Sequence, residues 1–343
     1  MKTKIVLFTL LLGLSLGLTA QIPQGYYDDA QGLSGTALKS ALHNIIKGHT
    51  EYSYNDLRDF ILKDTDEDPN NSNNVILLYT GRSQAKNTFG GGANDWNREH
   101  VWAKSHGGFG NNPPCGTDAH HIRPADASVN SSRGHKDFAM GGQQHPEATG
   151  CYYTEYTWEP RDEVKGDVAR MIFYMAVRYE GDNGEPDLEV VDQINTYPQP
   201  KHGKLSDLLV WNIQDPPDDF EIHRNNVIYG YQNNRNPFID HPEYVNAIWN
   251  PSSSSTSLTY SYDITIYPQP ATDKISIRSN NMKKDYYDIT IYNLFGQEVY
   301  TSDNTYYDGN IIVVDLPDLK PALYILQVTG ETRNFTTKLT IRR

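Results

Sequence analysis

The sequence predicts an α+β fold followed by a separate, smaller all-β domain. Residues 21–250 mix segments of helical apolar spacing with a short buried strand, whereas residues 259–343 consist of short alternating runs. Between them, residues 251–258 are rich in serine, a composition typical of a flexible linker. At 343 residues the chain is long enough for two domains.

Residues 1–20 have the pattern of a secretory signal peptide. Lys2 and Lys4 precede an apolar run that ends at Leu18, and cleavage is expected after Ala20. The run is too short and too weakly flanked for a stable membrane span. No other apolar stretch approaches membrane length, so the mature protein is expected to be soluble and exported.

Two segments of the first domain have the spacing of helices. Residues 34–49 follow a Ser34 cap with leucines and isoleucines at helical intervals. Residues 161–180 place six apolar side chains on one stripe, which predicts a second helix. Residues 75–81, VILLYTG, predict a short buried strand, and residues 182–250 predict packed loops with short helices.

Residues 259–343 are expected to form a small antiparallel β-sandwich. β-Branched and aromatic residues alternate in runs such as YDITIYPQPATDKISIRS, and turn-forming residues interrupt them every eight to twelve positions. This region has nine basic and ten acidic side chains, so nearly all of the net charge of −13 belongs to the first domain. Such an acidic chain is not expected to bind nucleic acid or acidic membranes through its overall field.

Cys115 and Cys151 are the two cysteines of the chain, and export to an oxidising compartment favours a disulfide between them. The bridge would close a loop of 37 residues and would stabilise the fold by about 4 kcal/mol in the chain-entropy description. Two buried free thiols are the alternative. A cysteine-based metal site would need more ligands than this chain offers.

Five of the eleven histidines fall within residues 100–135. Glu99 and His100 are adjacent in NDWNREHVWAKSHGG. A zinc-protease motif is excluded, because the glutamate precedes the histidine and the residue four positions after His100 is Lys104. The cluster is therefore either an ordinary polar loop or a functional site of another kind.

Asn130 occurs in PADASVNSSRGHK, which predicts a helix with Pro124 near its start, Asp126 in its first turn and Gly134 at its end. Asparagine is unfavourable in mid-helix because its side chain competes for backbone hydrogen bonds. A metal-ligand or substrate-contact role would explain its presence, and a plain surface asparagine is the alternative. Arg133, three residues on, shares its helix face.

Carboxylate, amide, imidazole and guanidinium groups are used together in phosphodiester hydrolysis. Glu99 and Asn130 offer hard oxygen ligands of the kind that Mg²⁺ prefers, with Mn²⁺ or Ca²⁺ as alternative ions. His100, when neutral, can take the proton from an attacking water near physiological pH. Arg133 and Arg123 can donate paired hydrogen bonds to phosphate oxygens.

The adjacent pair has a geometric consequence. Glu99 and His100 would point to opposite faces of a regular strand, so the backbone should bend or end its strand there. A separate acidic segment, DTDEDPNN at residues 64–71, lacks the glycine and the closing glutamate of a calcium loop. That segment is expected to be a solvated turn.

The region around these residues resembles the endonuclease I type of secreted and periplasmic nucleases, which are built on the ββα-metal motif. NREHVW is similar to the family's strand with its Glu-His pair. DAHHIRPADASVNSSRG is similar to its second strand and helix, with the family's spacing from Asp118 to Asn130. EPRDEVKGDVARMIFYMAVRY and QNNRNPFIDHPEYV also resemble family segments, so the resemblance covers most of residues 30–250.

The resemblance implies a secreted, metal-dependent endonuclease without sequence specificity, acting on DNA and with RNA as a further substrate. It places the general base on His100 and the two metal ligands on Glu99 and Asn130. Arg133 is expected to act with them on the reacting phosphate.

The other matched positions have supporting roles in this interpretation. Arg123 and Lys136 are expected to bind substrate. Asp118, His120 and His121 are expected to orient the site or support its structure, and this is also the alternative role for Arg123. The family does not require a cysteine pair. Residues 95–136 hold five basic and four acidic side chains, so few phosphate contacts and a shallow salt dependence are expected.

Residues 259–343 resemble the type A sorting domain of the type IX secretion system. IYPQPATDKISI is similar to its opening strand, IYNLFGQEV to its centre, and LKPALYILQV with TKLTIRR to its end. Gln269 and Ala322 depart from the usual asparagine and glycine. A carbohydrate-binding or adhesive β-sandwich is the alternative.

Together these features predict a monomeric enzyme that is exported through the periplasm to the exterior or to the cell surface, with the type IX machinery as a partner. The rival interpretation is a secreted binding or adhesive protein on a nuclease-like scaffold. The intact set of Glu99, His100 and Asn130 favours the enzyme.

Overall fold

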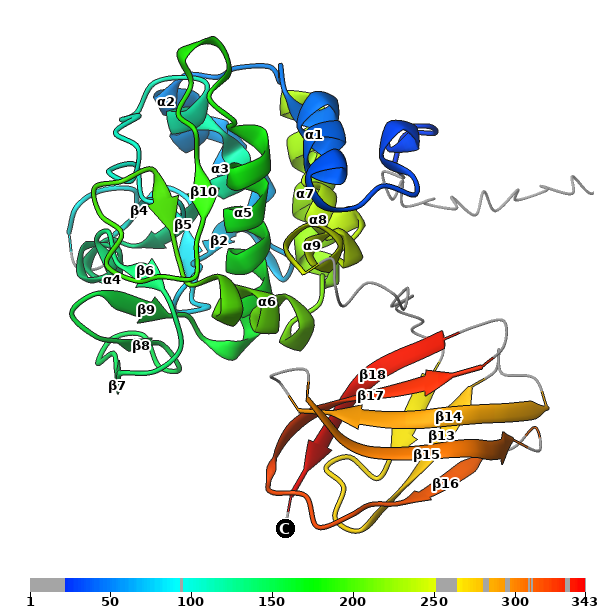
Figure 1. The fold of residues 1–343 in the computed structure, drawn as a ribbon. Coiled ribbons are helices and arrows are strands. Elements are labelled where there is room, and N and C mark those ends of the chain that lie inside the picture. Colours follow the sequence, from blue (N-terminus) through cyan, green and yellow to red (C-terminus); the bar gives the residue numbers. More distant parts are fainter. Residues whose placement is uncertain are drawn as a thin grey trace, which may run out of the picture.

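A computed structural model describes residues 22–92, 95–250, 264–279, 284–293, 297–307, 309, 311–330 and 334–342. The expected signal peptide and the serine-rich linker lie outside these residues. The described chain forms an α+β region up to residue 250 and an all-β region from residue 264 (Figure 1), which confirms the predicted fold class.

The central element of the first region is α5, Lys165–Arg178, whose 14 residues are all buried. It contacts α1 (Gly35–Ile46), α6 (Leu205–Gln214) and α8 (Pro237–Asp240) (Figure 1). The sequence predicted this helix from one apolar stripe. The remaining faces are also covered, because their polar side chains are paired inside the core.

The other helices include one that the sequence did not predict at its full length. α7 has 14 residues, although only short helices were expected between 182 and 250. Asp218 caps its first turn by accepting the Glu221 N–H at 2.8 Å. Its buried residues are mostly polar, so the helix leaves no apolar stripe in the sequence. The bounds of the remaining helices are α2 Tyr54–Asp56, α3 Leu62–Thr65, α4 Ala127–Arg133, α7 Asp219–Gln232 and α9 Glu243–Trp249.

Strands in the first region are short and belong to four small sheets, ordered β1-β2-β3, β4-β5, β6-β9-β8-β7 and β10-β11. The predicted strand at 75–81 is wrong beyond residue 76, since Leu77 and Leu78 are buried but outside any strand. A continuous apolar run does not distinguish a buried strand from a buried turn. The strands are β1 Glu67–Asp68, β2 Asn71–Ile76, β3 Ser83–Ala85, β4 Trp96–His100, β5 Ile122–Asp126, β6 Asp137–Phe138, β7 Gln143–Gln144, β8 Tyr152–Tyr153, β9 Thr157–Glu159, β10 Glu189–Val190 and β11 Lys201–His202.

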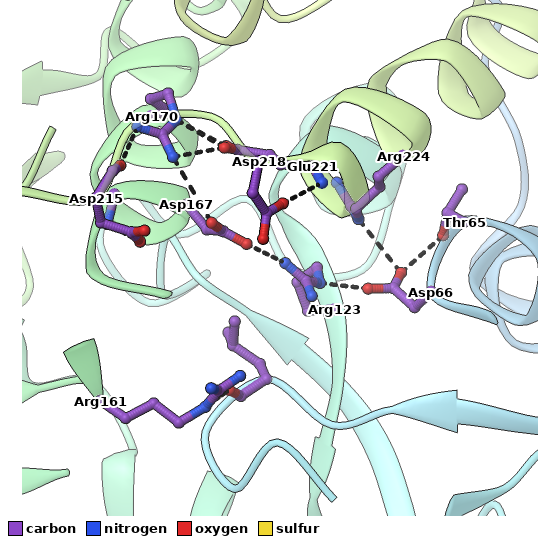
Figure 2. A network of polar contacts seen from close by, with 12 residues as sticks. Thr65, Asp66, Arg123, Arg161, Asp167, Arg170, Asp215, Asp218, Glu221 and Arg224 are labelled. Carbon is purple, nitrogen blue, oxygen red and sulfur yellow. Dashed lines mark hydrogen bonds and ion pairs between the residues drawn. The ribbon is translucent and has the colours of Figure 1, made fainter. Parts of the chain in front are cut away.

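Charged side chains join β5 to α5 and α7 inside the core (Figure 2). The Arg123 guanidinium donates to the carboxylate of Asp66 and, at 3.1 Å, to that of Asp167. Arg224 contacts the same Asp66 at 3.3 Å. Arg224 and Asp66 are almost fully buried, so removing Asp66 would leave the charge of Arg224 without a carboxylate partner, at a cost of about 3–5 kcal/mol.

This network also corrects the expectation of a solvated turn at residues 64–71. Asp66 and Asp68 are buried. Asp68 accepts the Asn70 N–H at 2.8 Å and is also bonded by the Ser83 hydroxyl. Asp68 therefore stabilises the turn through its hydrogen bonds, and Asp66 forms an ion pair in the core.

The expected disulfide is wrong, because Cys115 and Cys151 are both free and buried. The Cys151 thiol donates to the Tyr79 carbonyl at 3.3 Å. Burial raises the pKa of both thiols, to about 11 for Cys151. They are therefore neutral and behave as small apolar side chains, which was the alternative interpretation.

Asp118 connects the turn before β5 to α5 and α7 through hydrogen bonds. One carboxylate oxygen accepts the hydroxyls of Tyr174 at 2.8 Å and Tyr179 at 3.0 Å, and the other accepts the Gln232 amide at 3.0 Å. Burial acts to raise the pKa of Asp118, but neighbouring imidazoles and the Gln232 hydrogen bond outweigh it and hold the pKa well below its usual range.

The second region confirms the predicted β-sandwich. Its sheets are ordered β12-β13-β16 and β15-β14-β17-β18, and every named pairing is antiparallel. Apolar side chains from both sheets form one core. No helix in the described ranges has the length and hydropathy needed to cross a bilayer. The strands are β12 Ile264–Tyr267, β13 Lys274–Ser279, β14 Asp285–Tyr292, β15 Glu298–Tyr307, β16 Ile312–Asp315, β17 Ala322–Thr329 and β18 Asn334–Ile341.

The lowered pKa values of two buried histidines lead to a prediction of how the free energy of unfolding depends on pH. Burial lowers the pKa of His120 and of His121 to about 4, from an ordinary value of 6.5. The unfolded chain binds these protons more readily, so the stabilising contribution is complete above pH 6.5 and is lost as the pH falls toward 4. The free energy of unfolding should drop there by about 1.4 kcal/mol per pH unit for each histidine.

Urea unfolding at pH 7 and pH 5, followed by tryptophan fluorescence, measures this dependence for the first region, because all five tryptophans lie within residues 96–249. His120→Gln should make the dependence shallower. His223→Gln, at an exposed position, should leave it unchanged. A pH dependence that is equally steep in the wild type and in His120→Gln would contradict the prediction.

Candidate active site

The site is built by β4, β5 and α4. β4 and β5 are paired antiparallel strands, and α4 follows β5 directly in the chain. Glu99 pairs with Arg123 across the strands, and His100 pairs with Ile122. β4 ends at His100, as the adjacent Glu-His pair predicted. The predicted helix around Asn130 is confirmed, but it begins only after Asp126.

The helix has clear boundaries. Asp126 occupies the N-cap position and Gly134 the C-cap position with a φ of +57°, a conformation that glycine adopts without strain. Pro124, expected near the helix start, lies in β5 instead. The helix is therefore shorter than the sequence predicted, and it presents Asn130 in its second turn.

Glu99, His100 and Asn130 line one cavity of about 450 Å³. The structure therefore brings together the proposed base and both proposed metal ligands. The other lining residues are Tyr54, Phe89, Asn97, Arg98, Ala103, Lys104, Ser105, Gly134 and His135. Lys136 lines a neighbouring cavity of about 520 Å³, with Gly142, Gln143, Tyr153, Thr154 and Glu155.

Glu99 is almost fully buried and is held through one of its two oxygens. Oε1 accepts the Tyr79 hydroxyl at 2.5 Å and lies 3.3 Å from Nη1 of Arg133. Within the described part of the chain no donor contacts Oε2. Burial raises the pKa of Glu99, against the opposing effects of Arg133 and Tyr79. A cation in the cavity would stabilise the ionised form.

His100 has a defined tautomer. Its Nε2 lies 3.1 Å from the Gly116 carbonyl oxygen, which can only accept a hydrogen bond, so Nε2 carries the hydrogen and Nδ1 the lone pair. The imidazole stacks with the Tyr54 ring at 5.7 Å and 25°. Burial lowers the pKa of His100 well below its usual value, so the ring is neutral at pH 7 and able to accept a proton.

Asn130 has an amide orientation that is fixed by two acceptors. Nδ2 donates to Oδ1 of Asn97 at 2.7 Å and to the Arg98 carbonyl at 3.2 Å. A carbonyl cannot donate, so the nitrogen faces Arg98 and Oδ1 is left as the amide's acceptor. This geometry explains why asparagine is present in mid-helix.

The structure does not support a direct contact between Arg133 and substrate. The side chain is fully buried and donates to the carbonyls of His100 at 3.0 Å and Val101 at 2.6 Å. It also contacts Glu99 and, at 3.2 Å, Nε2 of His202. Arg133 therefore positions the end of β4 from behind.

The structure does not support substrate binding by Arg123 and supports the structural role that was its alternative. Its guanidinium is engaged by two carboxylates in the core (Figure 2). Arg123 is absent from the residues that line the cavity. Lys136 is half-buried and donates to the Ser132 carbonyl at 2.7 Å. An arginine in a polar motif looks the same in sequence whether it faces a phosphate or a buried aspartate.

The cationic side chains that do line the cavity are Arg98 and Lys104. The Arg98 guanidinium lies 3.4 Å from the centre of the Tyr54 ring. Lys104 is exposed and donates to Asn111 at 2.8 Å. Lys104 lies four residues after His100, and this spacing was the signal for its place at the cavity that the sequence contained. The approach of Tyr54 depends on long-range folding and left no local signal.

A second group of residues has the composition of a metal site. Ligand atoms of His106, Asp137 and His202 lie within 4.8 Å of one another and are buried. They already have partners, however. Oδ1 of Asp137 accepts the Thr196 hydroxyl at 2.8 Å, and His202 faces Arg133 through Nε2. This cluster therefore serves here as hydrogen-bonded support behind the cavity.

Comparisons with known proteins agree with the geometry. The family model described as Endonuclease I matches residues 34–243, and the model described as Secretion system C-terminal sorting domain matches residues 265–342. The chain is 63% identical over 225 residues to an extracellular ribonuclease of Bacillus amyloliquefaciens, covering 65% of this chain and 78% of that protein. It is 61% identical over 225 residues to an extracellular ribonuclease of Bacillus subtilis (strain 168), with the same coverage. Both resemblances found in the sequence are confirmed.

The tautomer of His100 should depend on Gly116. A Cβ at Gly116 would lie 2.6 Å from the Gly110 carbonyl oxygen, so Gly116→Ala must shift this loop and the carbonyl that His100 contacts. Long-range ¹H–¹⁵N spectra at pH 7 should show the Nε2–H form of His100 in the wild type and a mixture of tautomers in the variant.

Gly230→Ala is the matched control, because nothing lies within 4 Å of a Cβ at that position. Its His100 signals should match those of the wild type. An Nδ1–H tautomer in the wild type would overturn the assignment.

Proposed function

The chain belongs to the Endonuclease I family, and from that premise we propose that it hydrolyses nucleic-acid phosphodiesters with His100 as base and with a divalent cation on Glu99 and Asn130. The protein is a secreted nuclease with a type IX sorting domain over residues 265–342. We further propose that it acts as a monomer. The observation that carries the proposal is the convergence of these three side chains on one cavity.

The donor set fits a Mg²⁺-type ion. Oε2 of Glu99 and Oδ1 of Asn130 are hard oxygen atoms that the surrounding hydrogen bonds leave for another partner. Two protein ligands suit an ion that keeps several waters. When bound, the ion would stabilise charge on the reacting phosphate and the leaving oxygen. Mn²⁺ and Ca²⁺ have the same preference for oxygen.

His100 would remove the proton from the attacking water. Its Nδ1 lone pair is the free acceptor of the ring, since Nε2–H is engaged by Gly116. The stacked Tyr54 ring and the buried surroundings keep the imidazole oriented and neutral. These contacts prepare the base before substrate binds.

Phosphate oxygens would be held by Lys104 and Arg98. Both line the cavity, and the contact of Arg98 with the Tyr54 ring orders its guanidinium in advance. Two cationic contacts in an acidic domain imply a shallow salt dependence. Because the two Bacillus relatives are named extracellular ribonucleases, RNA is proposed as a substrate together with DNA.

Digestion of plasmid DNA and of RNA by the mature chain, with and without EDTA, tests the proposal. Activity should disappear on chelation and return with added Mg²⁺. His100→Ala should reduce turnover about 10²–10⁴-fold, the usual contribution of a positioned general base. His223→Ala, at an exposed site, is the control. Activity that survives chelation excludes the cation, and near-normal turnover of His100→Ala excludes the base.

A pair of lysine variants separates the two cavities. Lys104→Ala should lower kcat/KM about tenfold and reduce the slope of log kcat/KM against log salt concentration by about 1, as expected for one lost phosphate contact. Lys136→Ala should have a smaller effect on both quantities. A larger effect from Lys136 would instead restore its sequence-based assignment as the substrate-binding lysine.

A further inference from the structure

We propose that His135 and Tyr197 form a stacking platform for an unpaired nucleobase beside the scissile phosphate, and that this platform directs the enzyme toward single-stranded nucleic acid. The inference rests on the proposed function and deepens it by naming the substrate class. No finding above assigns a role to either ring.

The two rings already stack on each other at the edge of the cavity. Their centroids are 4.2 Å apart and their planes differ by 28°. His135 lines the cavity together with Gly134 and Asn130. Tyr197 is 47% exposed, which leaves ring surface open to a ligand.

Hydrogen bonds to buried groups hold the backbone at both rings of the platform. Nε2 of His106 lies 2.8 Å from the His135 carbonyl oxygen. Next to Tyr197, Thr196 donates its N–H and its hydroxyl to the two oxygens of Asp137 at 2.9 and 2.8 Å. The buried cluster of His106, Asp137 and His202 therefore holds both segments in place, so little ordering remains to be done when a base binds.

Other aromatic side chains of the cavity are already occupied. The Tyr54 ring carries the Arg98 guanidinium at 3.4 Å and also stacks with His100. Phe89 packs against Trp96 at 5.0 Å. Tyr197, which stacks on the cavity-lining His135, still offers a face for a base.

The charge of the platform suits a base better than a phosphate. Burial, helped by the nearby His106 and Lys136, lowers the pKa of His135, so its ring is neutral at pH 7. A neutral imidazole on a phenol ring carries no positive charge to attract phosphate, but it has a large π surface. Bases of every sequence can stack on such a surface, which agrees with a nuclease that does not read sequence.

Base stacking also distinguishes single-stranded from duplex nucleic acid. Bases within a duplex are stacked on their neighbours and have no free face, whereas bases of single strands and loops can turn outward onto aromatic side chains. A platform next to the cleavage cavity would therefore bind a nucleotide of a single strand and would not engage a duplex.

Kinetics with the full mature chain test this. Tyr197→Ala should lower kcat/KM for a single-stranded oligodeoxynucleotide about 5- to 100-fold, mainly by raising KM, which is the range for one lost base-stacking contact. Its effect should stay below about twofold on the same sequence as a duplex, and also on an equally long oligomer of abasic nucleotides. Tyr197→Phe should behave as wild type. Tyr156→Ala, at an exposed tyrosine outside both cavity linings, is the matched control.

Three results would overturn the platform while leaving the proposed function intact. Tyr197→Ala could cleave the single strand as well as wild type does. It could lose activity equally on all three substrates, which would show a structural role of the loop. Tyr197→Phe could be as impaired as Tyr197→Ala, which would assign the effect to the hydroxyl. Failure of the wild-type chain to cleave any substrate would instead contradict the proposed function itself.

Discussion

The buried guanidinium of Arg133 is the contact on which the geometry of the site depends. It donates to the carbonyls of His100 and Val101, where β4 ends, and it lies beside the carboxylate of Glu99. A strand that continued past His100 would turn the base and the neighbouring carboxylate to opposite faces. By satisfying carbonyls that no longer have a strand partner, Arg133 lets both side chains serve one cavity. The Arg133 guanidinium also contacts His202. His202 belongs to the buried cluster with His106 and Asp137 that supports the edge of the cavity.

A buried arginine of this kind is stable because its neighbours bind both terminal nitrogens, Nη1 and Nη2, whereas Nε has no hydrogen-bond partner among the described residues. Its partners are mostly backbone carbonyls, and Glu99 supplies a carboxylate whose pKa is raised by burial. The carboxylate is thus incompletely neutralised in the protein alone. A divalent cation on its open oxygen would supply the missing charge, so the same burial that positions Glu99 would also favour metal binding. The burial of Glu99 would thus determine both the position of the carboxylate and its affinity for the cation.

Sequence predicted the parts of the site that are local in the chain. Glu99 and His100 are adjacent, and Asn130 lies on a helix whose end is marked by glycine, so their association with β4 and α4 could be inferred from spacing. The contacts of Arg123 and Arg133 could not be inferred, because their partners lie far along the chain or are backbone carbonyls. The same limit applies to α7, whose buried face is polar and which therefore has no apolar period. Buried polar networks are specified by tertiary contacts, and sequence patterns do not report them.

The charge of the protein poses a physical problem for a nuclease, since a net charge of −13 opposes the approach of a polyanion. The structure places positive charge for phosphate binding at the cavity itself. Arg98 and Lys104 are at the cavity, while Arg123 and Arg133 are neutralised inside the core and contribute little field outside. Short-range contacts must then provide most of the affinity. Stacking on an aromatic ring is such a contact, because it is indifferent to salt and to the sign of the surrounding field. A secreted enzyme with few cationic contacts gains from it most where the substrate offers free bases, which is the physical reason to expect a preference for single strands.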